Sequence, residues 1–376
     1  MSRYDVAVVG VGIVGASAVY ALARAGARVV ALDAGVPGAG TSRTSFAWVN
    51  SVRKEPDVYH RLNADGLDAH RQLARALGAD GGFHDGGSLE WAEDGEAGAE
   101  LSARVQRLAA RGYRAEWISR ERALTLEPAL AIPDRVREAA FYAAEGWLDA
   151  PRAIRSLLTA ATTKGAEIRE STRVTSFRVR GDRVEALVID GGEVETDSTL
   201  VCAGPATQAF LASVGVTIPV GRVPGLLAVT SRPAQRLGRV VHAPGVHLRP
   251  DASGGLLLGA TDVDGLIDEA TTRDTASAVA GQLLARAARV FPAASDVRLV
   301  DARIGVRPMP ADGQTIAGRI PGFANAWMLA THSGVTLGPL LGRLIADEIV
   351  GRTPSAMLAA FRPERFAATT VKSTSG

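Results

Sequence analysis

The 376-residue chain is 47% hydrophobic and 22% charged, as an ordinary soluble globular protein is, and its length favours two domains. Its 42 basic and 40 acidic residues leave a net charge of only +2, and with no basic block this argues against nucleic-acid binding. The single cysteine, Cys202, excludes an internal disulfide framework and an iron–sulfur cluster, and the six histidines show no metal-ligand spacing. We therefore predict no metal site. Because no leader segment is visible, we expect the protein in the cytoplasm.

The N-terminus carries the pattern of a nucleotide-binding strand–helix–strand unit. Residues 5–9 are an apolar strand, and Gly10, Gly12 and Gly15 follow at the spacing of the dinucleotide fingerprint. In that fingerprint the first glycine makes the turn, the second lets backbone amides approach a pyrophosphate, and the third lets helix and strand pack. Asp33 ends the next strand, 23 residues after Gly10, where a carboxylate can bind a ribose hydroxyl.

A membrane span or a signal peptide is the competing interpretation, because residues 6–23 are almost wholly apolar. Asp5 is wrong for the positive start of a signal peptide, and the three glycines and the second strand fit the nucleotide fold. We therefore predict a nucleotide cofactor and no membrane segment.

Helical periodicity continues beyond this unit, and then gives way to alternating strands after Gly165. The end of the chain returns to a buried strand, a glycine turn and a helix. The predicted helices are 56–77, 98–111, 151–165, 271–290 and 335–350, and the predicted strands are 173–180, 183–189, 193–197, 199–204, several within 220–258, and 326–331.

This order resembles the D-amino acid oxidase family of FAD-dependent oxidoreductases, which includes glycine oxidase and monomeric sarcosine oxidase. The resemblance covers nearly the whole chain. Five pieces carry it: the glycine fingerprint with Asp33; Gly-Thr-Ser-Arg at 40–43; Val-Cys-Ala-Gly at 201–204; 246–250 with 258–262; and Gly-Val-Arg-Pro at 305–308, continuing through 312–318 to His-Ser-Gly at 332–334.

The resemblance implies an α/β fold, α+β overall, with a Rossmann-like FAD-binding domain and an antiparallel-sheet substrate domain of the D-amino acid oxidase/glutathione-reductase-2 type. The expected FAD-binding segments are 1–80, 145–215 and 300–376, and the expected substrate-binding segments are 81–144 and 216–299. No second fingerprint is present for a nicotinamide cofactor, so the substrate itself must reduce the FAD. The chain lacks the C-terminal cysteine that tethers flavin in monomeric sarcosine oxidase, and we expect the FAD to be non-covalent.

The resemblance also implies a set of cofactor-binding residues. For some of them a simpler explanation stays open: residues 41–43 fit a solvated loop, and Val174 and Trp48 fit plain packing. The predicted set is Gly10, Gly12, Ile13, Val14, Gly15, Asp33, Ala34, Thr41, Ser42, Arg43, Trp48, Val174, Cys202, Ala203, Gly204, Gly305, Arg307, Ser333, Gly334, Val335 and Thr336.

Four residues are predicted to face the substrate. Arg307 matches the family arginine that pairs with a substrate carboxylate, and the alternative is a structural ion pair with a residue such as Asp312. His332 begins the last helix and acts either on the substrate or as a supporting group. His247 and Asp262 fall on neighbouring predicted strands, where relatives often carry a tyrosine and an apolar residue, and this indicates a more polar pocket.

The predicted function is therefore an FAD-dependent oxidase of a small-molecule amine or amino acid. Hydride passes from the α carbon to flavin N5, an imine forms, and oxygen reoxidises the flavin to give hydrogen peroxide. One alternative is a flavin dehydrogenase of a 2-hydroxy acid or polyol with another acceptor. Another is a non-catalytic flavin-binding subunit of a complex. Substrate identity and oligomeric state stay open.

Overall fold

The computed structural model describes residues 3–93, 95–351 and 353–369. The predicted nucleotide-binding unit is present as β1 (Tyr4–Val9), α1 (Ile13–Arg24) and β2 (Val29–Leu32), with β1 and β2 parallel. Gly10 has φ +90°, which favours glycine, and a Cβ on Gly15 would lie 2.0 Å from the Gly10 carbonyl oxygen. The glycines therefore make the turn and the close helix–strand contact that the fingerprint predicts.

The first sheet has a parallel centre in the order β19-β12-β1-β2-β9. An antiparallel strand, β18, pairs with β19. The hairpin β10–β11 pairs through β11 with the first residues of β12, also antiparallel. The sequence suggests two strands at 193–204, but β12 is one strand that serves both the hairpin and the parallel centre. The further strands are β9 (Glu167–Arg169), β10 (Val174–Arg180), β11 (Arg183–Ile189), β12 (Gly192–Val201), β18 (Ile316–Arg319) and β19 (Ala326–Ala330).

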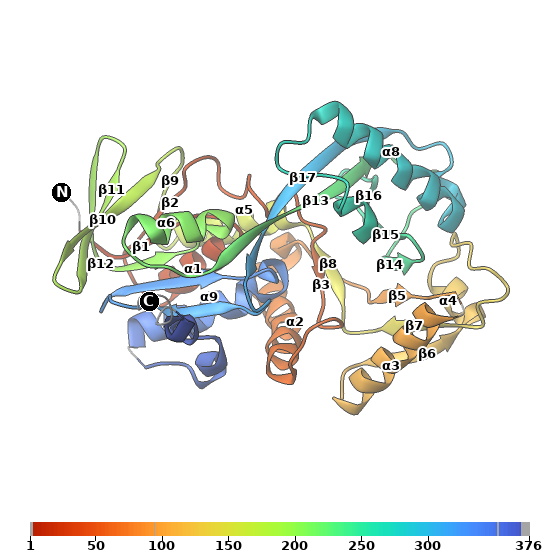
Figure 1. Cartoon of the computed structure of the whole chain (residues 1–376), viewed down its shortest axis with the longest axis horizontal. Coiled ribbons are helices and arrows are strands. Elements are labelled where there is room, and N and C mark those ends of the chain that lie inside the picture. The colour runs from red at the N-terminus through yellow and green to blue at the C-terminus, as the bar shows by residue number, and fades with distance from the viewer. Residues whose placement is uncertain (1–2, 94, 352, 370–376) are drawn as a thin grey trace, which may run out of the picture.

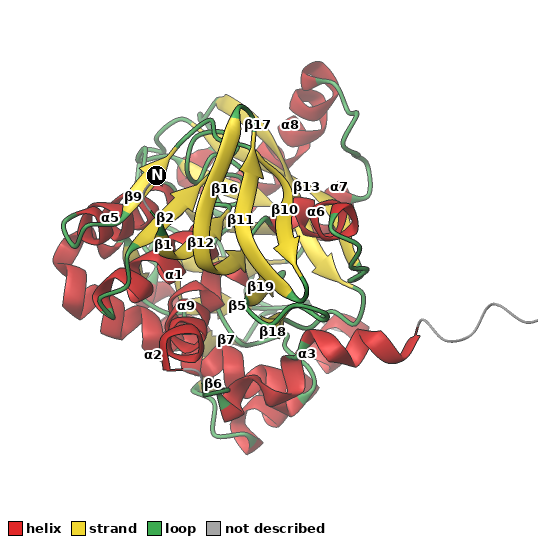
Figure 2. Ribbon diagram, turned by 90° about the vertical axis from the view of Figure 1, so that its left-hand side faces the viewer, coloured by secondary structure: helices red, strands yellow, loops and turns green. Residues whose placement is uncertain are grey.

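Helices α2 (Asp57–Leu77), α5 (Ala150–Thr162) and α9 (Gly334–Gly351) gather with α1 beside this sheet (Figures 1 and 2). Helix α9 packs so closely on α1 that a Cβ on Gly342 would lie 2.6–2.8 Å from the backbone of Ser17 and Ala18. This contact brings the start of the last helix to the glycine turn of the first.

The second sheet is antiparallel except for one parallel pair and has the order β17-β13-β16-β15-β14-β5-β7-β6. Helix α8 (Arg273–Val290) shares an apolar core with it, and α3 (Glu96–Ala110) and α4 (Arg120–Leu126) lie at its other end (Figure 1). Its strands are β5 (Ser88–Glu90), β6 (Ala115–Ser119), β7 (Glu138–Tyr142), β13 (Val220–Thr230), β14 (Val240–Ala243), β15 (Val246–Pro250), β16 (Leu256–Gly259) and β17 (Leu299–Pro310).

A small third sheet, β3 (Trp48–Val49), β8 (Gly146–Leu148) and β4 (Phe83–Asp85), and the short helices α6 (Thr207–Ser213) and α7 (Thr261–Asp264) complete the fold. Strand β17 pairs with β13 along its whole length and so belongs to the second sheet. The expected domain division places residues from 300 onward with the FAD-binding segments instead. The predicted fold class, α/β with one largely parallel and one largely antiparallel sheet, is confirmed.

Candidate active site

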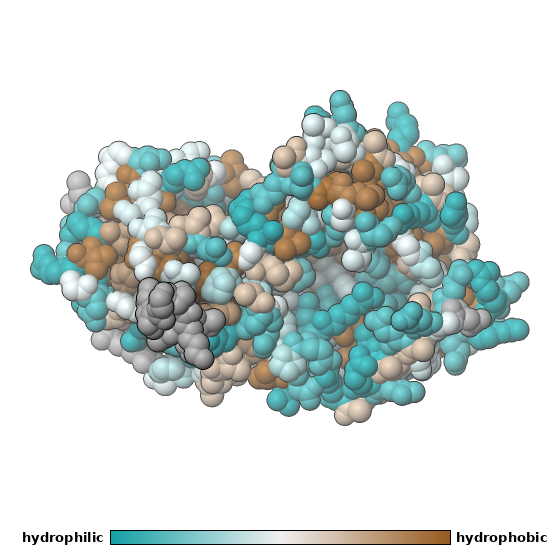
Figure 3. Space-filling model, in the orientation of Figure 1, coloured by the Kyte–Doolittle hydropathy of each residue, from teal (hydrophilic) through white to brown (hydrophobic). Residues whose placement is uncertain are grey.

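A cavity of ≈ 320 Å³ lies between the two large sheets. Its walls come from the start of α1, the loop at 41–54, the end of β12, the face of β13–β17, and the start of α9. The space-filling view shows this side of the molecule hollowed between the α8 side and the α3 side (Figure 3). Segments from both ends of the chain thus line one site.

At one end of the cavity the backbone amides of α1 are held ready for an anion. Gly12 precedes the helix without a side-chain cap, and Ser42 Oγ accepts a hydrogen bond from the Ile13 amide at 2.9 Å. A Cβ on Gly12 would lie only 3.1 Å from that Ser42 oxygen, so glycine keeps this approach open. The Asp33 carboxylate accepts from the Val11 amide at 2.8 Å and stiffens the same turn. A helix N-terminus of this kind suits a phosphate group.

The start of α9 forms a second electropositive wall. The first helical bond inside it runs from the Leu337 amide to the Ser333 carbonyl, so the three amides at 334–336 precede it and line the cavity. Tyr59 donates a hydrogen bond to Ser333 Oγ at 2.9 Å and holds this turn. The arrangement can stabilise negative charge on a planar ring system placed against it.

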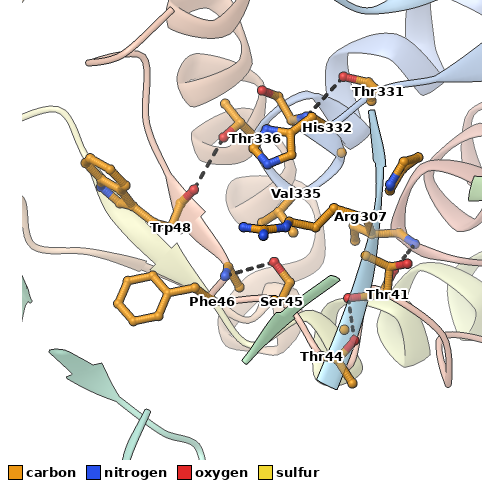
Figure 4. A pocket seen from close by; sticks show the side chains of 18 of the residues that line it. Thr41, Thr44, Ser45, Phe46, Trp48, Arg307, Thr331, His332, Val335 and Thr336 are labelled. Carbon is orange, nitrogen blue, oxygen red and sulfur yellow. Dashed lines mark hydrogen bonds between the residues drawn. The ribbon is translucent and has the colours of Figure 1, made fainter. Parts of the chain in front are cut away.

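His332 lies beside these amides with its side chain open to the cavity (Figure 4). Desolvation within the surrounding protein lowers its pKa to about 4, and the positive charges of Lys54 and Arg307 add to the effect. The imidazole is therefore neutral at physiological pH.

Arg307 extends from β17 into the centre of the cavity, where its guanidinium lies below His332 and points to the side of the view that holds Phe46 and Trp48 (Figure 4). Its Nη2 donates to the Pro224 carbonyl at 2.6 Å and to Asp264 Oδ2 at 2.9 Å. Gly225 leaves room for it, because a Cβ there would meet the guanidinium at 2.8 Å. The ion-pair partner is therefore Asp264, whereas Asp312 pairs with Arg365.

His247 lines the cavity from β15, but Asp262 does not line it. The chain leaves β16 at Gly259 and enters α7, so Asp262 lies on a short helix instead of the expected strand. Its carboxylate is exposed and makes a bidentate pair with Arg286 at 2.8–2.9 Å. On α7 it is Asp264 that reaches the cavity.

The structure brings most of the predicted residues together. Those lining the cavity are Gly12, Ile13, Val14, Thr41, Ser42, Trp48, Cys202, Gly204, His247, Gly305, Arg307, His332, Ser333, Gly334, Val335 and Thr336. Outside its lining lie Gly10, Gly15, Asp33, Ala34, Arg43, Val174, Ala203 and Asp262.

Sequence reasoning missed several ionisable groups at or beneath the cavity, of which Arg53 is one that lines it. Lys54 lines it, and desolvation lowers the pKa of its ammonium to about 8. Glu145 lies fully buried behind Trp48, and desolvation raises its pKa to about 8. Asp264 lies in no motif. A lysine or a glutamate in a loop carries no local signal of burial, so only the assembled fold reveals these two.

Comparison with known proteins identifies the family. Residues 5–348 match the family model described as FAD dependent oxidoreductase. The chain belongs to this family. A glycine oxidase from Geobacillus kaustophilus (strain HTA426) is 29% identical to it, with 96% of each chain covered. An opine oxidase subunit from Agrobacterium tumefaciens (strain Ach5) is 27% identical over 97% of this chain and 98% of that protein.

The solved structure of glycine oxidase from Geobacillus kaustophilus superimposes with a TM-score of 0.86 at 27% identity, covering 97% of this chain and 99% of that one. The family's cofactor fits the cavity described above. The start of α1, where Gly12 carries no side chain, suits the pyrophosphate, and the amides at 334–336 suit the flavin edge that gains negative charge on reduction. The protein is thus an FAD-dependent oxidoreductase.

Two further findings concern residues 3–93, 95–351 and 353–369. No helix there is both long and apolar enough to cross a bilayer. No group of three or more His, Cys, Asp or Glu side chains there could hold a metal ion.

Proposed function

We propose that this FAD-dependent enzyme oxidises an amine or amino acid that carries a carboxylate. The observation that carries the proposal is the guanidinium of Arg307 in the centre of the cavity. Its Nε and Nη2 bond to protein groups, whereas Nη1 has no partner among the described residues. A glycine oxidase and an opine oxidase subunit among the relatives support an amine substrate.

The chain's own residues bind and orient the substrate. Arg307 offers Nη1 to a carboxylate, and Asp264 with the Pro224 carbonyl holds the guanidinium in place. Bound FAD would supply the hydride acceptor, so no dedicated protein base is required. The amides at the start of α9 would stabilise the negative charge that develops, and His332 stays neutral beside them.

Further parts of the proposal concern the acceptor, the attachment of the cofactor and the architecture. We propose that oxygen reoxidises the flavin, that the FAD is non-covalent, and that the enzyme works in the cytoplasm. We also propose that the first sheet with its helices is the FAD-binding part. The second sheet would then be the substrate-binding part.

Replacement of Arg307 tests the proposal. Truncating one partner of a buried charge pair costs about 2–5 kcal/mol, so Arg307→Ala should lower kcat/KM for a carboxylate substrate roughly 30- to 5,000-fold. Arg307→Lys should recover only part, because it keeps the charge but loses the bonds from Nε and Nη2 that hold the guanidinium in place. Arg303→Ala is the matched control, since Arg303 lies on the same strand, outside the cavity lining, and pairs with Asp301.

Flavin content measured in each variant separates substrate binding from cofactor binding. Normal activity of Arg307→Ala on a carboxylate substrate, or loss of FAD from this variant, would refute the proposal that Arg307 binds the substrate carboxylate. Anaerobic bleaching of the flavin by amino, N-methyl amino and 2-hydroxy acids decides between amine oxidation and the hydroxy-acid alternative. The opine oxidase relative is by name one subunit of an enzyme, and bleaching by the chain alone would exclude a non-catalytic role here.

A further inference from the structure

Two histidines face each other on the second sheet at the cavity. His242 on β14 and His247 on β15 are cross-strand partners, and both line the cavity. Glu90 on β5 lies beside His242, and Gly259 on β16 lies beside His247 in register. Because paired residues point to the same face of a sheet, these four positions form one row, of which His242, His247 and Gly259 line the cavity.

The two rings share a hydrogen bond between their Nδ1 atoms at 2.9 Å. Desolvation lowers the pKa of both imidazoles, most strongly that of His242, so both are neutral at physiological pH. A bond between two neutral rings needs one Nδ1 that carries hydrogen and one that does not. The ring that donates from Nδ1 then has a bare Nε2, and the other ring carries its hydrogen on Nε2.

Burial decides which ring donates. His242 is 4% exposed, packs against Trp48 with ring centroids 4.0 Å apart and planes tilted by 44°, and its Nε2 is buried without a partner among the described residues. Buried N–H groups without an acceptor are rare, whereas a bare lone pair is tolerated more often. His242 therefore donates from Nδ1, and His247 carries its hydrogen on Nε2. That Nε2 has no partner within the described residues, and it is a donor available to a ligand.

The charges around the pair favour an anion as that ligand. Arg53 lies near both rings and bonds to Glu90 at 2.9 Å, while Arg104 bonds to the same carboxylate at 2.5 Å. The carboxylates of Asp262 and Asp264 on α7 also act electrostatically on His247. Among described residues, the charged side chains of the cavity lining are Arg53, Lys54 and Arg307 against the single carboxylate of Asp264.

His247 is too far from Arg307 to bind the same carboxylate. A Cβ on Gly259, beside His247, would lie within 4 Å of Leu226 and Leu227 on β13, and a Cβ on Gly225 of that strand would meet the Arg307 guanidinium. Two strand spacings and two residues along the strand place the backbone positions of His247 and Gly225 on the order of 10 Å apart. A ligand that accepts one hydrogen bond of about 2.8 Å from each of the two side chains must therefore carry two separate acceptor groups, as a short dicarboxylate does.

We propose that His247, held as an Nε2–H donor by His242, binds a second carboxylate of the substrate, which is therefore an amine or amino acid with two carboxylates. His242 is the positioning residue and His247 the specificity-determining residue. This inference rests on the proposed amine oxidation with the first carboxylate on Arg307.

Paired substrates test the proposal on the unaltered holoenzyme. Glutamate of each handedness is compared with norvaline, and iminodiacetate with N-ethylglycine, since each pair differs by a carboxylate in place of a methyl group. We expect at least one dicarboxylate to reduce the flavin with kcat/KM at least about tenfold above its partner. No preference for any dicarboxylate, or a preference for glutamine over glutamate, overturns the second-carboxylate site. Failure of every amine refutes instead the proposed function.

Variants of the pair test the roles of the two rings. His247→Phe should lower the ratio of kcat/KM for dicarboxylate over monocarboxylate roughly 10- to 150-fold, as for a hydrogen bond to a charged group. His247→Gln should restore part of the ratio, because its amide nitrogen takes the place of Nε2. His242→Phe should lower the ratio, and His242→Asn, with an amide nitrogen in the place of Nδ1, should restore it. Equal losses for both substrates overturn the assignment.

Nitrogen-15 NMR of histidine-labelled protein tests the tautomers without any substitution. We expect a neutral His242 protonated on Nδ1 and a neutral His247 protonated on Nε2. The opposite pair of tautomers overturns the positioning role of His242, whether or not the variants fold.

Discussion

Glu145 gives the sharpest quantitative prediction, because a carboxyl group is fully buried there beneath the cavity. Trp48 Nε1 and Ser88 Oγ donate to its Oε2 at 2.9 and 2.6 Å, and Tyr113 OH donates to its Oε1 at 2.7 Å. These bonds favour the charged form, but desolvation outweighs them and raises the pKa from 4.5 to about 8. Glu145 is therefore protonated in the folded protein at neutral pH.

The raised pKa links stability to pH. Below pH 4.5 the carboxyl is protonated in the folded and the unfolded chain, whereas between 4.5 and about 8 only the folded chain keeps the proton. Its contribution to the free energy of unfolding is thus lost as pH rises through this window, by about 1.4 kcal/mol per pH unit. Glu145→Gln cannot ionise, so between pH 5 and 7.5 its stability relative to the wild type should rise by about 3 kcal/mol.

Urea unfolding of the holoprotein at several pH values measures this difference. Taking variant minus wild type cancels the histidines that titrate in the same range. Glu116→Gln is the control, because it removes a carboxyl group that is exposed on β6 instead of buried. A difference for Glu145→Gln that does not change with pH would mean that Glu145 is ionised in the folded protein, and the desolvation argument would be wrong.

Four further outcomes are expected. Gly12→Val should abolish FAD retention, because a side chain there intrudes between Ser42 and the pyrophosphate. The control, Gly281→Val on α8, has open space around its Cβ and should keep the normal ratio of flavin to protein absorbance. Acid precipitation should release intact FAD, and flavin left on the precipitate would contradict non-covalent binding. The kcat/KM for an amine should rise with pH as its neutral form grows, and a flat profile from about pH 6 to 10 would refute this step. His332→Gln should keep the shape of that profile, since the pKa of His332, about 4, lies below the pH range of the profile. A step near pH 8 that disappears in Lys54→Met belongs to Lys54.

Local sequence patterns predicted those parts of the fold whose periodicity is strong. The strand–helix–strand unit at the N-terminus and the helices at 57–77 and 273–290 follow from apolar spacing and glycine turns. Strand β17 escaped prediction because its residues are half-buried and lack alternation. Its partner β13 lies about eighty residues earlier in the chain, and the pairing of the two defines it.

For the residues of the site, too, local motifs predicted some and missed others. Arg307, His247 and His332 reached the cavity because they stand in motifs that span the fold, although their roles stay predictions. Asp262 was misplaced, since the strand before it ends at Gly259 and nothing local announces the turn into α7. His242 could have been found, because a hairpin turn at Pro244-Gly245 sets it opposite His247.

The cavity draws its walls from Gly12 at one end of the chain and Thr336 near the other, and α9 completes it by packing on α1. During synthesis at roughly 5–20 residues per second, the ribosome needs roughly 15 s to a minute to make the intervening chain. A nascent chain therefore has a glycine turn but no closed pocket for most of its translation. Cofactor capture must wait until α9 has left the ribosomal exit tunnel, so any protein truncated before that helix will be made without flavin.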